Sequence, residues 1–443
     1  MVRLLIIADD FTGALDTGVQ FATRGATTRV VTNADYDFKQ ANAEVLVMVA
    51  ESRHLPPAEA YSMVYRAARN AREAGIPYVY KKTDSALRGN IGSELAAVMD
   101  AAEMTAMPFL PAFPKMKRVT RNGVHYVDGV PVAESVFGKD PFEPVTASAL
   151  TEIIGSQTEK PVVCHRLDSP VAPELPGIQV YDAETDGDLA RIGSALGPGG
   201  LHISAGCAGF ATALADILGL RGPTPRMPLL PRALFVACGS VNPVTLRQMQ
   251  TAEEAGFVHI HLNPVQKLEP SWLESRDCES KIKSWLEQAA GCRRCILDVN
   301  DPEGRNDTAE YAAEHGLTTE DLRVRISTQL AHLMKRLLDS GLDATILCTG
   351  GDTLLALMRT VGVAELTPVR ELATGAVLTN FVYQGKTYHI ISKSGGFGEP
   401  ALFCGLAALV GAGNQRRIYY ADQIQFENAP RCFQRRGRPG EDL

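Results

Sequence analysis

The stretch Leu4-Leu5-Ile6-Ile7-Ala8-Asp9-Asp10-Phe11-Thr12-Gly13-Ala14 decides the class of fold. Its apolar run predicts a buried β-strand, and apolar residues at helical spacing over 13–23 predict a helix directly after it. A short buried strand that leads into a helix is typical of parallel or mixed sheets covered by helices. Ligands of such sheets bind beyond the carboxyl ends of the strands, so Asp9, Asp10 and Thr12 are well placed to hold polyol hydroxyls. The alternative is that Asp10 or Thr12 only caps the helix.

The same alternation of short strands and longer helices continues along the chain and predicts an α/β protein with two α/β domains. Four prolines within 220–232 interrupt it, because proline denies hydrogen bonds to both helices and sheets. We therefore expect domains at 1–222 and 233–414, a linker at 223–232 and a peripheral tail at 415–443. The expected strands are 4–8, 45–49, 78–80, 162–164, 201–204, 233–237, 258–261, 295–299 and 344–348; the expected helices are 13–23, 57–74, 91–102, 243–255, 281–290 and 322–338; and 377–383 with 386–392 form an expected hairpin.

The composition narrows the class of partner. The 443 residues carry a net charge of −7 and include nine cysteines. The acidic balance argues against a nucleic-acid partner, and no apolar stretch is long enough to cross a membrane. The N-terminal residues enter the first strand without a secretory pattern, so we expect a cytoplasmic protein with reduced cysteines. Cys292 and Cys295 form a lone CxxC pair, which we interpret as core thiols in preference to a zinc site. The sequence is also compatible with a homo-oligomer.

Two further predicted strands end in charged residues. Glu51-Ser52-Arg53 follows strand 45–49, and the forked guanidinium of Arg53 suits a carboxylate, with a surface salt bridge as the alternative. Strand 78–80 is followed by cations, acids and hydroxyls that suit an anionic substrate or a transferring phosphoryl group. The members of this group are Lys81, Lys82, Thr83, Asp84 and Arg88. The stiff segment 109–114 and the basic residues after it are expected to form a loop near this site, or a plain solvated loop.

Three glycine-containing turns follow predicted strands in the second half of the chain. After Gly239, either Ser240 or Asn242 only caps the next helix, or the N-terminus of that helix also presents backbone N–H groups to a phosphate. Gly350-Gly351-Asp352-Thr353 joins a strand to a helix, and paired glycines let the main chain approach an anion closely. Asp352 is expected to bind Mg²⁺ or to accept the proton of a substrate hydroxyl. Lys393-Ser394-Gly395-Gly396 is interpreted as a second nucleotide-binding loop.

Four segments together resemble the four-carbon acid sugar kinase family. They are Ala8-Asp9-Asp10-Phe11-Thr12-Gly13, Lys82-Thr83-Asp84-Ser85 with Leu87-Arg88-Gly89-Asn90, Gly350-Gly351-Asp352-Thr353, and Lys393-Ser394-Gly395-Gly396-Phe397-Gly398. The resemblance implies a sugar-acid-binding N-terminal domain, a nucleotide-binding C-terminal domain and an active site in the interdomain cleft. It also implies phosphorylation of the terminal (C4) hydroxyl of D-threonate or D-erythronate with ATP and Mg²⁺, and 3-oxo-tetronate is the alternative substrate.

The residues expected in this site follow from the motifs and the resemblance together. Those expected to bind the sugar acid are Asp9, Asp10, Thr12, Arg53, Lys81, Lys82, Thr83, Asp84 and Arg88, and those expected to bind ATP are Ser240, Gly350, Gly351, Asp352, Thr353, Lys393, Gly395 and Gly396. Either Asp9 or Asp352 is expected to act as the catalytic proton acceptor. One departure from the family pattern is Gly396, where asparagine is more usual. A dehydrogenase or aldolase of the same acids, or a non-catalytic sensor, are the rival hypotheses.

Overall fold

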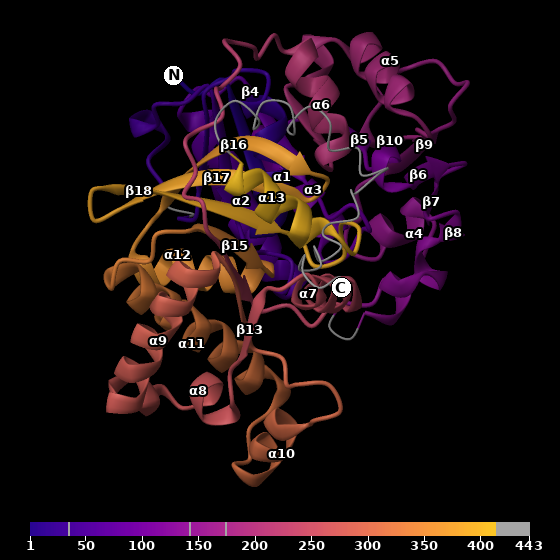
Figure 1. Cartoon of the computed structure of the whole chain (residues 1–443). Coiled ribbons are helices and arrows are strands. Elements are labelled where there is room, and N and C mark those ends of the chain that lie inside the picture. The colour runs from indigo at the N-terminus through magenta and orange to yellow at the C-terminus, as the bar shows by residue number, and fades with distance from the viewer. Residues whose placement is uncertain (34–35, 141–142, 173–174, 413–443) are drawn as a thin grey trace, which may run out of the picture. The chain divides into compact units, whose positions relative to one another are not determined.

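The computed structural model describes residues 1–33, 36–140, 143–172 and 175–412 (Figure 1). It is an α/β protein with parallel and antiparallel strands, which confirms the expected fold class. The chain divides into two compact units. Among the described residues, the first contains Met1–Met227, Gly350–Glu371 and Gly375–Ser394, and the second contains Pro228–Thr349, Leu372–Thr374 and 395–412. The predicted domain boundaries and interdomain cleft stay predictions, and the expected tail lies outside the described residues.

The first unit is built on a mixed sheet with the strand order β18-β17-β16-β2-β3-β1-β4-β11-β5-β10-β9. The strands from β2 to β9 in this order run parallel, whereas β16 is antiparallel to β2 and β17 is antiparallel to β18. The bounds are β1 Leu4–Ala8, β2 Thr28–Val31, β3 Val45–Val49, β4 Tyr78–Lys82, β5 Ala106–Leu110, β9 Val162–His165, β10 Gly177–Tyr181, β11 Ile203–Gly206, β16 Glu365–Ala373, β17 Ala376–Tyr383 and β18 Lys386–Lys393.

Helices and a small second sheet complete this unit. The helices are α1 Phe11–Ala22, α2 Pro57–Glu73, α3 Ile91–Ala102, α4 Leu150–Gly155, α5 Asp186–Leu196, α6 Ala208–Ile217 and α12 Gly351–Val361. The small sheet is antiparallel and consists of β6 Arg118–Arg121, β7 Val124–Val127 and β8 Val130–Pro131. Short 3-10 turns lie at Phe38–Gln40, Pro114–Met116, Val132–Glu134, Val136–Lys139 and Pro198–Leu201.

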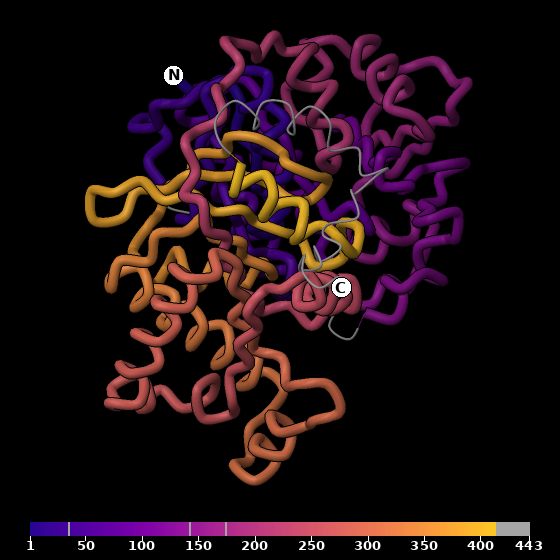
Figure 2. The backbone as a smooth tube through the Cα atoms, in the orientation of Figure 1, coloured from indigo at the N-terminus to yellow at the C-terminus, as the bar shows by residue number. Residues whose placement is uncertain are grey.

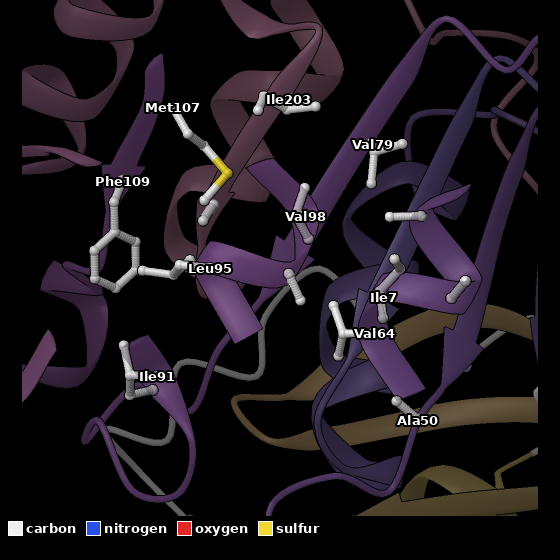
Figure 3. Packing of buried hydrophobic residues seen from close by; sticks show 14 of the residues in the cluster. Ile7, Ala50, Val64, Val79, Ile91, Leu95, Val98, Met107, Phe109 and Ile203 are labelled. Carbon is white, nitrogen blue, oxygen red and sulfur yellow. The ribbon is translucent and has the colours of Figure 1, made fainter. Parts of the chain in front are cut away.

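The core of the first unit lies where α2 and α3 cover one face of its sheet. Successive side chains of a strand point to opposite faces, so Ile7 of β1 and Val79 of β4 both reach this core. Figure 3 shows Val64 of α2 beside Ile7, and Leu95 of α3 beside Phe109 of β5. Each buried aliphatic or aromatic side chain of this kind stabilises the fold by about 1.5–3 kcal/mol. This core holds the carboxyl ends of the central strands in fixed positions.

The second unit contains a parallel sheet with the strand order β13-β14-β12-β15. Its strands are β12 Leu234–Cys238, β13 Val258–His261, β14 Arg294–Asp298 and β15 Thr345–Thr349. Its helices are α7 Pro243–Glu254, α8 Pro264–Leu268, α9 Arg276–Cys292, α10 Asp307–Glu314, α11 Thr319–Asp339 and α13 Leu402–Gly411, with a 3-10 turn at Pro270–Glu274. Among the described residues of both units, no helix is both long and apolar enough to span a membrane.

Most predicted elements are present with ends shifted by one or two residues, and the predicted hairpin is confirmed as β17 and β18. The expected strand 201–204 is present as β11, two residues later, after a 3-10 turn. Two predictions of local structure were wrong. The expected stiff loop at 109–114 overlaps β5, which ends at Leu110. The basic segment after Pro114 forms β6 and β7 instead of an irregular loop.

Candidate functional site

The carboxyl ends of β1, β3 and β4 bring acids and bases of the first unit into one ion network. These strands are neighbours in the sheet, so the loops that follow them meet. Arg53 donates from Nε to Oδ2 of Asp9 at 2.8 Å, and its Nη2 lies 2.7 Å from the same oxygen and 2.7 Å from Oδ1 of Asp10. Lys82 Nζ lies 3.1 Å from Oδ1 of Asp9 and 3.3 Å from Oδ1 of Asp10. Two cations thus hold two adjacent carboxylates.

The N-terminus of α1 is shaped around this network. Asp10 caps the helix by accepting from the backbone N–H of Gly13 at 3.2 Å, and it also accepts from Thr12 Oγ1 at 2.7 Å. Asp10 therefore both caps the helix and forms the ion pairs, so capping is not its only role. Gly13 leaves the space in which the Lys82 ammonium lies, because a Cβ atom there would be 2.1 Å from Nζ. Any larger residue at position 13 would displace the lysine.

Arg53 is held in place by the loops on either side of it. Glu51, two residues after the end of β3, has a φ of 51°, in the left-handed region that non-glycine residues rarely adopt. Strained backbone of this kind is concentrated at functional sites. Asn90 Nδ2 donates to the carbonyls of Ser52, Arg53 and Leu55. The position of the guanidinium is therefore fixed by its backbone as well as by its ion pairs.

Asp84 extends the network towards Arg88. Arg88 donates to both oxygens of Asp84, from Nε at 2.9 Å and from Nη2 at 3.1 Å, and from Nη1 to Asp140 at 3.2 Å. Arg53 Nη2 lies 3.6 Å from Oδ1 of Asp84. The side chain of Arg88 is 24% exposed, compared with 9% for Arg53 and 6% for Lys82. Arg88 is thus the most accessible of these three cations.

Burial and charge act in opposite directions on this network. Burial favours the neutral form of Asp10, but Arg53 and Lys82 outweigh it and hold its pKa below the usual value. Burial also opposes ionisation of Asp84, but Arg88 and Arg53 keep its pKa well below normal. Burial disfavours the charged form of Lys82, yet Asp9 and Asp10 raise its pKa. Asp10, Asp84 and Lys82 therefore remain charged at neutral pH.

Lys81 lies on the other face of the sheet from Lys82, because adjacent residues of a strand alternate. Its ammonium is fully buried, lies 3.0 Å from Oε2 of Glu94 on α3 and donates to the carbonyl of Lys82. Burial raises the pKa of Glu94, which also forms a short hydrogen bond with Ser52 Oγ. The ammonium of Lys81 is thus paired with Glu94, and its expected contact with the sugar acid stays a prediction. Thr83 is buried as well, and its hydroxyl donates to the carbonyl of Gly206 at 3.3 Å.

The turn Gly350-Gly351 belongs to the first unit and lies against the start of α1. Gly350 has a φ of 94°, which favours glycine, and a Cβ atom on Gly351 would lie 3.6 Å from Cγ2 of Thr12. Asp352 is exposed in the first turn of α12, and Thr353 is buried after it. Glu51 pairs with Arg359 of the same helix at 2.8 Å. A predicted nucleotide motif and a predicted sugar-acid motif are thus side by side.

Asp16 is a functional candidate that the sequence reasoning missed. It follows Thr12 by one helical turn, so the two side chains share a face of α1. Ser394 Oγ, next to Lys393 at the end of β18, donates to Oδ2 of Asp16 at 3.3 Å. Burial, with Glu371 and Asp10 adding to it and Lys82 opposing it, raises the pKa of Asp16 to about 7. The four-residue spacing from Thr12 was the available sequence signal.

The second unit brings together Ser240, Gly395 and Gly396. A Cβ atom on Gly395 would lie 3.0 Å from Oγ of Ser240 and 3.2 Å from Cβ of Asn242, and one on Gly396 would lie 3.7 Å from Nδ2 of Asn242. Thr245 Oγ1 donates to the carbonyl of Gly395 at 2.9 Å. Asn242, not Ser240, caps α7 through its side chain. The glycine loop therefore packs directly on the turn after β12.

Comparison with known proteins adds family evidence to this geometry. A family model described as a sugar-binding N-terminal domain matches residues 4–214, and one described as a nucleotide-binding C-terminal domain matches residues 235–403. A D-threonate kinase of Salmonella typhimurium is 32% identical, with 91% of this chain and 97% of that protein covered. A D-erythronate kinase of Heliobacterium modesticaldum is 28% identical, with 91% and 96% covered. A 3-oxo-tetronate kinase of Methylobacterium radiotolerans is 26% identical, with 90% and 96% covered.

Solved structures share the fold. A Salmonella typhimurium LT2 protein is 22% identical with a TM-score of 0.76, and the match covers 91% of this chain and 98% of that one. A Haemophilus influenzae protein is 20% identical with a TM-score of 0.68, and the match covers 95% and 99%. These likenesses confirm the path of the chain.

Proposed function

Because this chain belongs to the four-carbon acid sugar kinase family, we propose that it transfers the γ-phosphoryl group of ATP to the terminal (C4) hydroxyl of D-threonate or D-erythronate. Kinases of four-carbon acid sugars use ATP, and the matched nucleotide-binding model agrees with this. D-Threonate is the first choice, because the relative with 32% identity is a D-threonate kinase. 3-Oxo-tetronate remains the second choice, since a relative that acts on it is 26% identical.

One observation carries the assignment of the site. Asp10, the N-cap of α1, belongs to the ion network; Thr12 in the first turn lies at the Gly350-Gly351 turn, and Asp16 in the second turn bonds to Ser394 at the end of β18. Phosphoryl transfer needs an acceptor hydroxyl and a polyphosphate held next to each other. We therefore place the transfer at this end of α1.

The charge of the ion network suits hydroxyl groups. It contains four carboxylates, Asp9, Asp10, Asp84 and Asp140, and three cations, Arg53, Lys82 and Arg88. Carboxylates accept hydrogen bonds from sugar hydroxyls, and the cations hold the carboxylates in position. We assign the carboxylate of the substrate to Arg88, because this arginine is the most accessible of the three cations.

Asp16 is our choice for the group that accepts the proton. Asp9 is fixed by Arg53 and Lys82, whereas Asp16 is partly buried beside the site with a pKa of about 7, close to the value at which a general base works best. In the proposed step, Asp16 takes the proton of the terminal hydroxyl while the hydroxyl oxygen forms a bond to the γ-phosphorus. The bond between that phosphorus and the oxygen bridging to the β-phosphate breaks, and its electron pair leaves with ADP.

Asp352 and Glu51 suit a magnesium ion. Mg²⁺ prefers oxygen ligands and is commonly held by one or two carboxylates together with phosphate oxygens. Burial is the main cause of the raised pKa of Glu51, and Asp352 adds to it. We assign both carboxylates to the metal because of the chemistry of their oxygens. When bound, the ion would neutralise negative charge on the phosphates. Asp352 is thereby assigned to the nucleotide, together with the main chain of Gly350 and Gly351.

The experiment that tests this function is an ADP-release assay with the purified full chain. The acceptors are D- and L-threonate, D- and L-erythronate, 3-oxo-tetronates and longer aldonates. We expect the highest kcat/KM with D-threonate or D-erythronate, and a product phosphorylated at C4 by NMR. ADP release with 3-oxo-tetronates alone would refute the assignment of D-threonate or D-erythronate as the substrate. Inactivity with every four-carbon acid would refute the proposed kinase activity.

A further inference from the structure

Two histidines and an aspartate converge on one face of the sheet in the second unit. His259 and His261 are two residues apart on β13, so both side chains point to the same face. Asp298 ends the neighbouring strand β14 and is paired in register with His261. One potential ligand atom from each residue lies within 4.8 Å of the other two. This cluster is not part of the site at α1.

The hydrogen bonds of the two imidazoles place a carbonyl or carboxylate oxygen at Nδ1 of each ring. Nδ1 of His261 lies 3.0 Å from the carbonyl oxygen of Asn300, which only accepts, so this nitrogen carries the proton. Nδ1 of His259 lies 3.1 Å from Oε2 of Glu253, a carboxylate oxygen that also accepts. With the proton on Nδ1 in each ring, Nε2 of His261 has its lone pair, and Nε2 of His259 faces Oδ2 of Asp298. Metal-binding histidines usually have this arrangement, in which a carbonyl or carboxylate holds the other nitrogen.

The carboxylate is oriented in a similar way. Oδ1 of Asp298 accepts from the backbone N–H of Asn300 at 3.0 Å and from its Nδ2 at 2.7 Å. Oδ2 faces the histidines, 3.0 Å from Nε2 of His259 and 3.8 Å from Nδ1 of His261. Asp298 is 1% exposed, so this oxygen is buried next to imidazole nitrogen. Supporting hydrogen bonds therefore orient all three potential ligands.

A simpler interpretation is a protonated His259 between Glu253 and Asp298. That arrangement would accommodate the 3.0 Å approach of Nε2 to Oδ2, since two lone pairs would otherwise face each other. It does not use His261, although the rings of His259 and His261 lie only 4.0 Å apart between centroids. The two interpretations therefore differ in what they require of His261.

We propose that His259, His261 and Asp298 form a binding site for a divalent transition-metal ion of the zinc, cobalt or nickel class. Two imidazoles and one carboxylate suit these ions, and such a set leaves one or more positions for water. Mg²⁺ prefers ligand sets made of oxygen, so this site is distinct from the one assigned to the kinase reaction. The proposal does not depend on the substrate of the kinase.

The test is a Co²⁺ and Zn²⁺ titration of the chelator-treated full chain, followed by absorption spectroscopy and calorimetry. We expect one ion per chain and a visible Co²⁺ spectrum of nitrogen and oxygen ligation. His261→Gln should weaken binding at least tenfold and leave the Tm without metal unchanged, because the His259–Asp298 contact remains. His332→Gln, at a half-buried histidine on α11, is the matched control and should bind as the wild type does.

Other outcomes would overturn the proposal. If His261→Gln bound the metal ions with unchanged affinity, His261 would not be a ligand, and the interpretation of a protonated His259 between Glu253 and Asp298 would be preferred. Loss of binding in Cys292→Ser would move the metal to Cys292 and Cys295, whose sulfurs lie 3.2 Å apart. Absence of stoichiometric binding by the wild type would exclude the site altogether.

Discussion

Arg53 holds Asp9 through two nitrogens that meet a single oxygen, with Nε at 2.8 Å and Nη2 at 2.7 Å from Oδ2. Because Nη2 also reaches Asp10 at 2.7 Å, one planar group fixes two neighbouring carboxylates. A lysine has a single nitrogen at the end of a flexible chain and does not reproduce this fork. The relationship makes the shape of the residue at position 53 as important as its charge.

Arg53→Lys should therefore lower kcat/KM with D-threonate by about a hundredfold, because misplacement of a reacting group by about 1 Å costs that much. The measurement is steady-state ADP release with both substrates varied. Arg69→Lys on α2 is the control, since Arg69 forms an exposed pair with Glu73 and should keep full activity. Wild-type kinetics in Arg53→Lys would show that charge alone is enough.

Asp16→Asn should reduce kcat by about 10²–10⁴, the usual contribution of general-base catalysis. In the wild type, the pKa of about 7 predicts that the rate rises with pH through 7 and then levels, because only the ionised carboxylate accepts a proton. The groups that act on Asp16 are Glu371, Lys82, Asp10 and Ser394. The pH profile of the residual activity should be flat in the variant. A variant with the wild-type slope would assign the proton transfer to another group.

The same substitution should stabilise the protein at alkaline pH. The pKa of Asp16 is raised from 3.8 to about 7 on folding, so the folded state binds the proton more tightly than the unfolded state. Stability linked to this group is present below pH 4 and is lost as the pH rises through 7. Asparagine removes this loss, so the Tm of Asp16→Asn should exceed that of the wild type at pH 8 and match it near pH 4. An equal difference at both pH values would contradict the raised pKa.

Lys81→Met should destabilise the fold by about 3–5 kcal/mol, because it leaves the buried carboxylate of Glu94 without its cation. Adding Glu94→Gln should restore part of this loss, which urea unfolding of both variants would measure. If Lys81 acts only through Glu94, the KM for the sugar acid should stay unchanged in the folded double variant. A raised KM for the sugar acid together with wild-type stability would instead indicate that Lys81 contacts the substrate.

Gly395→Ala should raise the KM for ATP by about 5- to 150-fold, which corresponds to an overpacking cost of about 1–3 kcal/mol. The new methyl group would lie 3.0 Å from Oγ of Ser240 and 3.2 Å from Cβ of Asn242, so the loop must shift. Gly291→Ala in α9 is the matched control. No atom lies within 4 Å of a Cβ at that position, and the change should slightly stabilise the helix. Equal KM values for the two variants would argue against nucleotide contact at Gly395.

The convergence of Asp9, Asp10, Arg53 and Lys82 was predictable from sequence because strong local signals and topology agree. Each of these residues lies at or just beyond the carboxyl end of a short apolar strand, and such ends meet wherever the strands are neighbours. The two lysines show the limit of this reasoning. Adjacent residues of a strand point to opposite faces of the sheet. Lys81 and Lys82 therefore have different partners although they are neighbours in the sequence. Only the position of Glu94 on α3 decides where Lys81 finds its partner.

The strands β6 to β8 were missed although the sequence contains their turns. Asn122-Gly123 and Asp128-Gly129 have φ values of 53° and 71°, and of 51° and 82°. Such pairs are strong hairpin signals. The basic residues around them, however, favoured the prediction of a solvated loop. The placement of Asp16 beside Ser394 had no sequence signal of comparable strength, because it depends on a contact across 378 positions.

The first unit is assembled from segments that are far apart in the chain. β16 pairs with β2 through Glu365 with Val31 and Leu366 with Val30, and residues 350–394 trace this return in orange and yellow (Figure 2). During synthesis, β2 is therefore an uncovered edge strand until its partner leaves the ribosome more than 300 residues later, and open edges invite pairing with other chains. A gene fragment that stops at residue 227 would leave that edge permanently open and omit Ser394 beside Asp16. Chaperones that shield nascent chains should thus matter more for the yield of this enzyme than its size alone suggests.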